Sequence, residues 1–166
     1  YAYIKFKLTG MANKSINSVD LSTRASMNTG KTMVASLRSV ANTDFTRSTL
    51  KWSNKPSFGS DELATTFVEA SSARKSFVPV GTKLVDYINS VLASGKEEVA
   101  FALIYKEGDG ADFKWMGGKG DGAYGPILKY TEGQNAAAYA TADGTAIQAT
   151  PDANANSLAA TNIFVR

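Results

Sequence analysis

The chain has 166 residues, of which 43% are hydrophobic, and this is enough for one domain with a packed core and a tail. Histidine and cysteine are both absent, which excludes disulfides, thiolate metal sites and a Ser-His-Asp catalytic triad. The net charge is +3 and the pI is near 9.1, but the basic residues are spread singly and do not indicate a nucleic-acid-binding surface. No apolar run approaches the roughly 18 residues of a membrane-spanning helix. Tyr1 enters a strand directly, without a signal peptide, as expected of a mature or excised form.

Alternating apolar and polar residues predict three β-strands in the first part of the chain. In the first strand Ile4, Phe6 and Leu8 share one face. The second strand, at residues 16–21, is expected to be bulged because its apolar residues are not spaced strictly by two. The third strand occupies residues 32–40.

Residues 48–59 form the stretch around which the chain is organised, S-T-L-K-W-S-N-K-P-S-F-G. Leu50 and Trp52 are expected on one face of a strand, and Pro56 then sets a turn. Two interpretations of Trp52 stay open: a core side chain, or a ring offered to the face of a sugar. Beyond this stretch, residues 65–68 favour a strand over a helix because they are β-branched and aromatic.

One helix is predicted at about residues 82–94. Thr82 is its expected N-cap, and Gly95 its expected stop. Its apolar stripe consists of Leu84, Val85, Ile88, Val91 and Leu92. The helix is expected to close one open end of a sandwich, with partner binding as the alternative. Residues 97–105 follow and become apolar on both faces, which is typical of a central strand.

Three aspartates lie in two neighbouring glycine-rich loops: Asp109, Asp112 and Asp121. Oxygen ligands on such loops suit calcium, although their spacing is not that of an EF-hand. The alternative is that they are ordinary turn residues. Structural calcium is therefore the one candidate cofactor.

Trp115 and Tyr124 are candidate sugar contacts, because an aromatic ring can stack on the apolar face of a sugar; packing inside the sandwich is the alternative. Glycoside hydrolysis requires two carboxylates facing one cleft. Glu97 and Glu98 are adjacent and point to opposite faces, so we expect no enzymatic activity. Asn13 begins a glycosylation sequon, which matters only in a host that glycosylates secreted proteins.

The composition changes near Gly133. Residues 133–166 are small, polar and nearly free of charge, and they end in the short apolar run I-F-V before the last residue. We divide the chain into a β-sandwich domain, residues 1–132, and an extended linker and strand tail, residues 133–166. The predicted fold class is all-β: an antiparallel, jelly-roll-like β-sandwich with one short helix and an extended C-terminal strand.

Several segments together resemble the DNRLRE-domain family, a group of secreted β-sandwich modules related to carbohydrate-binding modules and to disaggregatase-related repeats. The similar segments are Y-I-K-F-K-L-T-G at 3–10, F-T-R-S-T-L-K-W-S-N-K-P-S-F-G at 45–59, residues 84–104, and P-I-L-K-Y at 126–130. The most specific positions are Leu50, Trp52, Asn54 and Pro56. The resemblance implies a secreted β-sandwich over roughly residues 1–131.

The chain departs from that family in three places. Phe45 and Arg47 stand where the family tends to have Trp and Glu, and G-G-K at 117–119 replaces a Ser-Arg-Glu element. The family's first strand is missing at the front of the chain. Similar sequence occurs at the back, at residues 138–141 and 161–166, so the first strand is expected to have moved to the C-terminus.

Three interpretations of the tail stay open. The tail can fill the gap in its own domain, fill the gap in the next subunit, or belong to the next repeat of a longer chain. A sandwich that lacks a strand has an open edge that invites pairing, and donation of a strand from head to tail builds filaments. The candidate donor residues are Tyr139, Ile147, Leu158, Ile163, Phe164 and Val165. The candidate acceptor groove contains Ile4, Phe6 and Leu8.

The sequence leads to two hypotheses of function. The first is a secreted structural subunit that polymerises into an extracellular filament by donating its C-terminal strand, with copies of itself as partners. The alternative is a carbohydrate-binding module of an extracellular enzyme or adhesin, with a polysaccharide as partner. The basic pI favours an acidic polymer for the second hypothesis.

Overall fold

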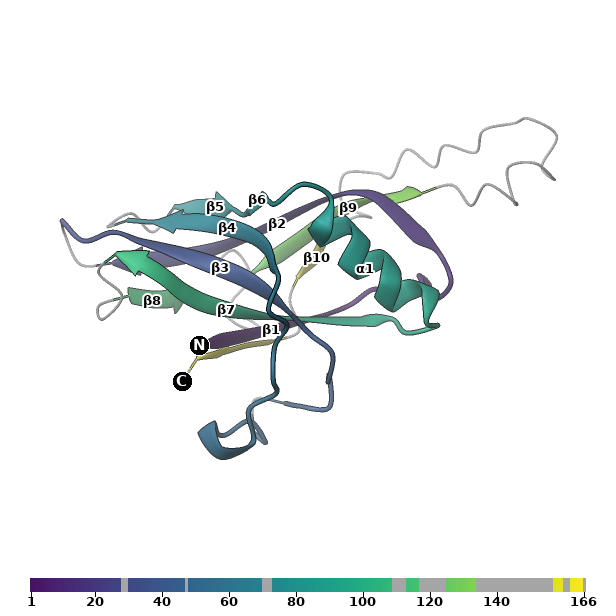
Figure 1. The fold of residues 1–166 in the computed structure, drawn as a ribbon, viewed down its shortest axis with the longest axis horizontal. Coiled ribbons are helices and arrows are strands. Elements are labelled where there is room, and N and C mark those ends of the chain that lie inside the picture. The colour runs from purple at the N-terminus through teal and green to yellow at the C-terminus, as the bar shows by residue number, and fades with distance from the viewer. Residues whose placement is uncertain are drawn as a thin grey trace, which may run out of the picture.

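The computed structural model describes residues 1–27, 30–46, 48–69, 73–108, 113–116, 125–133, 157–159 and 162–165. Within these residues, two antiparallel sheets pack face to face and one helix lies along one end of them (Figure 1). The predicted all-β sandwich with one helix is confirmed. None of the helical segments in the described ranges has the length and hydrophobicity to cross a bilayer.

The larger sheet contains β1 (Ala2–Lys7), β3 (Met33–Val40), β4 (Glu62–Val68), β6 (Val78–Pro79), β7 (Glu98–Gly108) and β11 (Asn162–Val165), in the order β11-β1-β7-β3-β4-β6. The smaller sheet contains β2 (Ser15–Met27), β5 (Arg74–Ser76), β8 (Phe113–Met116), β9 (Ile127–Gly133) and β10 (Ser157–Ala159). Its order is β10-β9-β2-β5, and β8 also pairs with β2. The helix α1 spans Lys83–Ala93, and a short 3-10 turn, η1, spans Trp52–Asn54.

The main core lies between the two sheets and under α1. Ile4, Phe6 and Leu8 are fully buried there, as their alternation with lysines predicts. The ring of Phe6 meets that of Phe101 edge to face at 6.3 Å. The predicted bulge in the second strand is confirmed by a register shift between Ile16 and Ser18 in the pairing of β2 with β9.

Strand β7 is central, as predicted, and is covered on both sides because a second core lies on the outer face of the larger sheet. This outer core contains Tyr3, Val40, Phe45, Leu50, Ala100 and Ala102. Part of it comes from the connection between β3 and β4, residues 41–61, which folds over β1 and β7. This connection carries η1 away from the body of the sandwich (Figure 1).

The prediction that Leu50 and Trp52 share one face of a strand is wrong. Leu50 is buried, but Trp52 begins the turn η1 and is 58% exposed. The cause is local, because the Asn54 side chain accepts a hydrogen bond from the Lys51 N–H and donates one to the Thr49 carbonyl oxygen. Such bonds from an asparagine to nearby backbone compete with strand pairing.

The helix matches its prediction closely. Leu84, Ile88 and Leu92 are buried, with the two predicted valines partly buried beside them. Thr82 is the N-cap, although its hydroxyl donates to the carboxylate of Asp86, at 2.6 Å, instead of capping the backbone. The stop at Gly95 has a φ of 79°, a conformation that favours glycine.

The C-terminal segment contributes one strand to each sheet. Leu158 in β10 pairs with Leu128 in β9, and Ile163 in β11 pairs with Ile4 in β1. In this arrangement β11 covers the edge of β1 within the same chain, which corresponds to the first of the three interpretations of the tail. The division of the chain at residue 132 stays a prediction.

Candidate functional site

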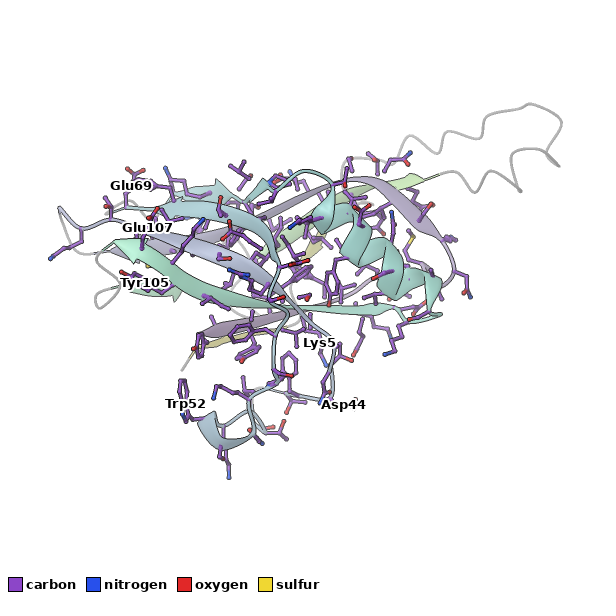
Figure 2. The ribbon with its side chains drawn as sticks, viewed as in Figure 1. Lys5, Asp44, Trp52, Glu69, Tyr105 and Glu107 are labelled. Carbon is purple, nitrogen blue, oxygen red and sulfur yellow. The ribbon has the colours of Figure 1, made fainter. Side chains whose placement is uncertain are left out.

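The turn η1 presents an exposed tryptophan, Trp52. Trp52 extends from this turn toward the start of the chain and is 58% exposed (Figure 2). The turn is held by the Asn54 side chain, which bonds to the backbone that leads into it, at 2.6 Å from the Lys51 nitrogen and 2.8 Å to the Thr49 oxygen. Pro56 follows and restricts the backbone further.

Two further aromatic rings form a cluster with Trp52. Tyr1 stacks on Trp52 with ring centroids 5.6 Å apart and ring planes only 7° from parallel. Phe58 contacts Tyr1 at 5.4 Å in a tilted arrangement. The hollow beside these rings has a volume of only about 10 Å³, so it is shallow.

Two lysines flank the rings. The Lys55 ammonium lies 4.0 Å from the centroid of the Trp52 ring, and its Nζ also donates to the Trp52 carbonyl oxygen at 3.4 Å. Lys51 lines the same hollow and is exposed. The residues that line this hollow include no carboxylate. We call Tyr1, Lys51, Trp52, Lys55 and Phe58 the Trp52 platform.

The outer core anchors the connection that carries the platform. The Tyr3 hydroxyl donates a buried hydrogen bond of 2.8 Å to the Pro56 carbonyl oxygen. Burial, and then the neighbouring Tyr1, raise the pKa of Tyr3, so its hydroxyl keeps its proton and donates. Lys5 donates to the carbonyl oxygens of Thr43, at 2.8 Å, and Phe45, at 3.3 Å. The platform is therefore held in place without a ligand.

The chemistry of the platform is that of recognition. Flat aromatic rings stack on the apolar C–H faces of other rings, and ammonium groups beside them attract anions. A surface that is already ordered loses little conformational entropy when a ligand binds.

Sequence reasoning missed most of this platform. It weighed Trp52 as a sugar contact but did not join it to Tyr1, Lys51, Lys55 or Phe58. The interleaving of basic and aromatic residues in K-W-S-N-K-P-S-F was the available signal. Tyr1 lies about fifty positions away in the chain, so no local pattern indicates that it stacks on Trp52.

Of the two predicted sugar contacts, the structure describes only the backbone of Trp115. Trp115 lies in β8, where its backbone pairs with Ala25 of β2. Tyr124 lies outside the described residues. Both stay predictions.

The predicted calcium ligands Asp109, Asp112 and Asp121 also lie outside the described residues. Within the described ranges, no three His, Cys, Asp or Glu side chains come close enough together to hold a metal ion. The calcium site therefore stays a prediction.

The predicted donor residues fall into two groups. Tyr139 and Ile147 lie outside the described residues, and Leu158 lies in β10. Ile163, Phe164 and Val165 lie in β11, where they pair with residues 4, 3 and 2 of β1.

Comparison with known proteins adds two findings. The family model of carbohydrate-binding module family 96 matches residues 1–118, which include the whole connection that carries the Trp52 platform. A gellan lyase from a Bacillus species is 31% identical over 107 residues. The matched stretch is 63% of this chain but only 4% of that protein. No solved structure gives a significant match.

Proposed function

Since the chain belongs to carbohydrate-binding module family 96, we propose that it is a non-catalytic module that binds an acidic polysaccharide through the Trp52 platform. The observation that carries the proposal is the 58% exposed Trp52, held in a rigid turn with two lysines beside it. Trp52 lies together with the exposed ring of Tyr1, and apolar side chains that gather on a surface often mark a binding site. We propose further that the module acts outside the cell, as part of a longer protein.

The physical argument joins the two kinds of side chain on the platform. Tyr1 covers part of one face of the Trp52 ring, and the exposed surface that remains on the two rings supplies apolar area against which a sugar ring can pack. Lys51 and Lys55 supply positive charge that a carboxylated sugar would complement, and this contribution weakens with salt. A shallow surface of this kind suits one side of a continuous sugar chain. The gellan lyase match makes gellan the first polymer to test.

The decisive experiment compares two exposed aromatic residues. Trp52→Ala should reduce binding to gellan or polygalacturonate at least about tenfold, since a stacked aromatic ring is a typical binding hot spot. Phe67→Ala is the matched control, because Phe67 is 50% exposed on β4 and is not part of the platform. Binding is measured by affinity electrophoresis and calorimetry, with circular dichroism to show that both variants fold. Equal binding by wild type and Trp52→Ala would overturn the assignment.

Two further variants test the contributions of the two lysines and of Trp115 separately. Replacing Lys51 and Lys55 together with Met should weaken binding to polygalacturonate and flatten its salt dependence. Binding to a neutral dextran should not change in the same variant. Trp115→Ala, measured in the same way, tests whether the predicted contact in β8 takes part.

A second candidate function is assembly by strand donation, in which β11 of one copy would take the place that β11 of the same chain has beside β1. Four residue pairs join these strands, from Ala2 with Val165 to Lys5 with Asn162. The same register is available to β11 of a second copy, because an edge strand pairs with any compatible strand. This proposal includes the DNRLRE-like first strand relocated to the C-terminus.

Light scattering and negative-stain microscopy test the assembly proposal. We expect filaments from the full chain and none from a chain that ends at Gly133. Replacing Ile163 and Val165 with Asp should have the same effect as the truncation while leaving the monomer soluble. Monomers from the full chain at all concentrations would exclude assembly and leave binding as the function.

A further inference from the structure

A second hollow lies between α1 and the backbone that leaves β3. Its volume is about 200 Å³, against about 10 Å³ at the Trp52 platform. Pockets for drug-sized ligands span roughly 300–1,000 Å³, so this one suits a single small ring. We call it the α1 groove, and it is lined by Val40, Ala41 and Thr43 on one side and Tyr87, Ser90, Val91, Ser94, Lys96 and Glu98 on the other.

The hydroxyl groups along the groove are arranged as acceptors. The Ser90 hydroxyl donates to the Tyr87 carbonyl oxygen, and the Ser94 hydroxyl donates to the Val91 carbonyl oxygen, each at 2.7 Å. Each serine has one proton and two lone pairs, so its oxygen remains able to accept a bond from a ligand. Sugar hydroxyls are such donors.

Charged and apolar groups complete the lining. Lys96 is exposed and supplies N–H donors, while the Glu98 carboxylate supplies acceptors. Ala41 and Val91 supply apolar contact for the C–H groups of a ring. This mixture of convergent polar groups on an apolar lining is typical of a site for a small polar ligand.

The groove is formed before any ligand arrives. The Tyr87 hydroxyl lies 3.0 Å from the carbonyl oxygens of both Val40 and Ala100, and so it joins α1 to β3 and β7. Lys5 is 3.4 Å from the Glu98 carboxylate and donates to the Thr43 carbonyl oxygen, so it ties the two walls together. Preformed walls reduce the conformational cost of binding.

We infer that the α1 groove binds one terminal sugar ring of a carbohydrate chain, separately from the Trp52 platform. The inference takes its ligand class from the proposed function. A hollow of this size admits one ring, whereas the shallow platform accepts a run of units. The module would therefore hold a chain along its length at one site and by its end at the other.

Nuclear magnetic resonance tests the inference on the full chain, with D-glucose, D-mannose and D-glucuronate as probes. At least one probe should shift the amide signals of Ser90, Ser94 and Lys96 in a saturable way, with a Kd of roughly 1–10 mM. Ser90→Gln adds a longer side chain at an exposed helix position and should raise that Kd at least about tenfold. Ala93→Gln is the matched control, because Ala93 is exposed on the same helix but does not line the groove.

Two outcomes would overturn the inference: no saturable shift with any probe up to about 100 mM, or the same shifts in Ser90→Gln as in wild type. Failure of the proposed function is a separate result. It would appear as unchanged polysaccharide binding in Trp52→Ala, a variant that leaves the α1 groove intact. The probes are single sugars and the readout is local to α1, so the two results do not depend on each other.

Discussion

The hydroxyl of Tyr3, on the first strand, donates a buried 2.8 Å hydrogen bond to the carbonyl oxygen of Pro56, in the connection that carries Trp52. Through this bond the sheet fixes the position of the platform. Removing the donor leaves a buried carbonyl oxygen without its partner, which costs about 1–3 kcal/mol.

Tyr3→Phe should therefore lower the free energy of unfolding by about 1–2 kcal/mol and weaken polysaccharide binding several-fold. The stability is measured by urea denaturation and the binding by calorimetry. Tyr105→Phe is the control, because the Tyr105 hydroxyl donates to the Gly108 carbonyl oxygen at an exposed position. If both variants lose the same stability, the bond to Pro56 has no special role.

A buried hydroxyl in β2 should be replaceable with a gain in stability. Thr23 is 1% exposed, and its Oγ1 has no hydrogen-bond partner among the described residues. Thr23→Val keeps the shape of the side chain and removes the buried polar group, so stability should rise by about 1 kcal/mol.

Thr66→Val is the matched control for Thr23→Val, and its effect on stability should have the opposite sign. Thr66 is equally well buried, but its hydroxyl donates to the Ser76 carbonyl oxygen at 3.2 Å. The same substitution should therefore destabilise the protein by about 1 kcal/mol. Thermal denaturation of both variants checks the pair, and a change of the same sign in both would contradict this account.

Glycine is required at the end of β7. Gly108 has a φ of 102°, and a Cβ atom placed there would lie 2.7 Å from the Cα of Met33 and would also collide with the Thr32 carbonyl oxygen. Because both obstacles are backbone, Gly108→Ala should cost about 3 kcal/mol or more. Gly10→Ala should cost only about 1 kcal/mol, since Gly10 has a φ of 78° with open space around it. Urea denaturation of the two variants measures the difference, and equal losses would contradict the prediction.

A cluster of charged side chains on the outer face of the larger sheet links stability to pH. The Glu62 carboxylate lies 3.0 Å from the Lys106 ammonium and 3.9 Å from the Arg38 guanidinium. Burial by itself would raise the pKa of Glu62, but hydrogen bonds from Lys106 and Ser36 and the two positive charges lower it below its ordinary value of 4.5.

A carboxylate with a lowered pKa in the folded state binds fewer protons there than in the unfolded state. Its contribution to stability is therefore complete above the ordinary pKa and is lost as the pH falls through the lowered one. We expect Glu62→Gln to cost up to about 1 kcal/mol at pH 7 and almost nothing near pH 2. Denaturation at the two pH values measures this. Glu107→Gln, at the exposed end of β7 (Figure 2), should show little effect at either pH.

The strands and the helix were predictable because their signals are local. The alternation of Ile4, Phe6 and Leu8 with lysines fixes which face of β1 is buried, whatever packs against it. The stripe on α1 and the stop at Gly95 follow in the same way from the period of a helix and the φ of glycine. The resemblance led to a carbohydrate-binding-module-like sandwich, and the family match confirms this at that level.

What the sequence by itself determined is thus the class of protein: an all-β sandwich with one helix and no triad or thiolate chemistry. Only the tertiary structure decided which distant residues come together at the two proposed sites. Trp52 is exposed because Asn54 turns the backbone beneath it, and it forms a platform because Tyr1 reaches it from the start of the chain. The α1 groove likewise requires Lys5, Thr43 and Glu98 to meet in space. Contacts between residues so far apart leave no periodic pattern in the sequence, since periodicity reports only which face of an element is buried.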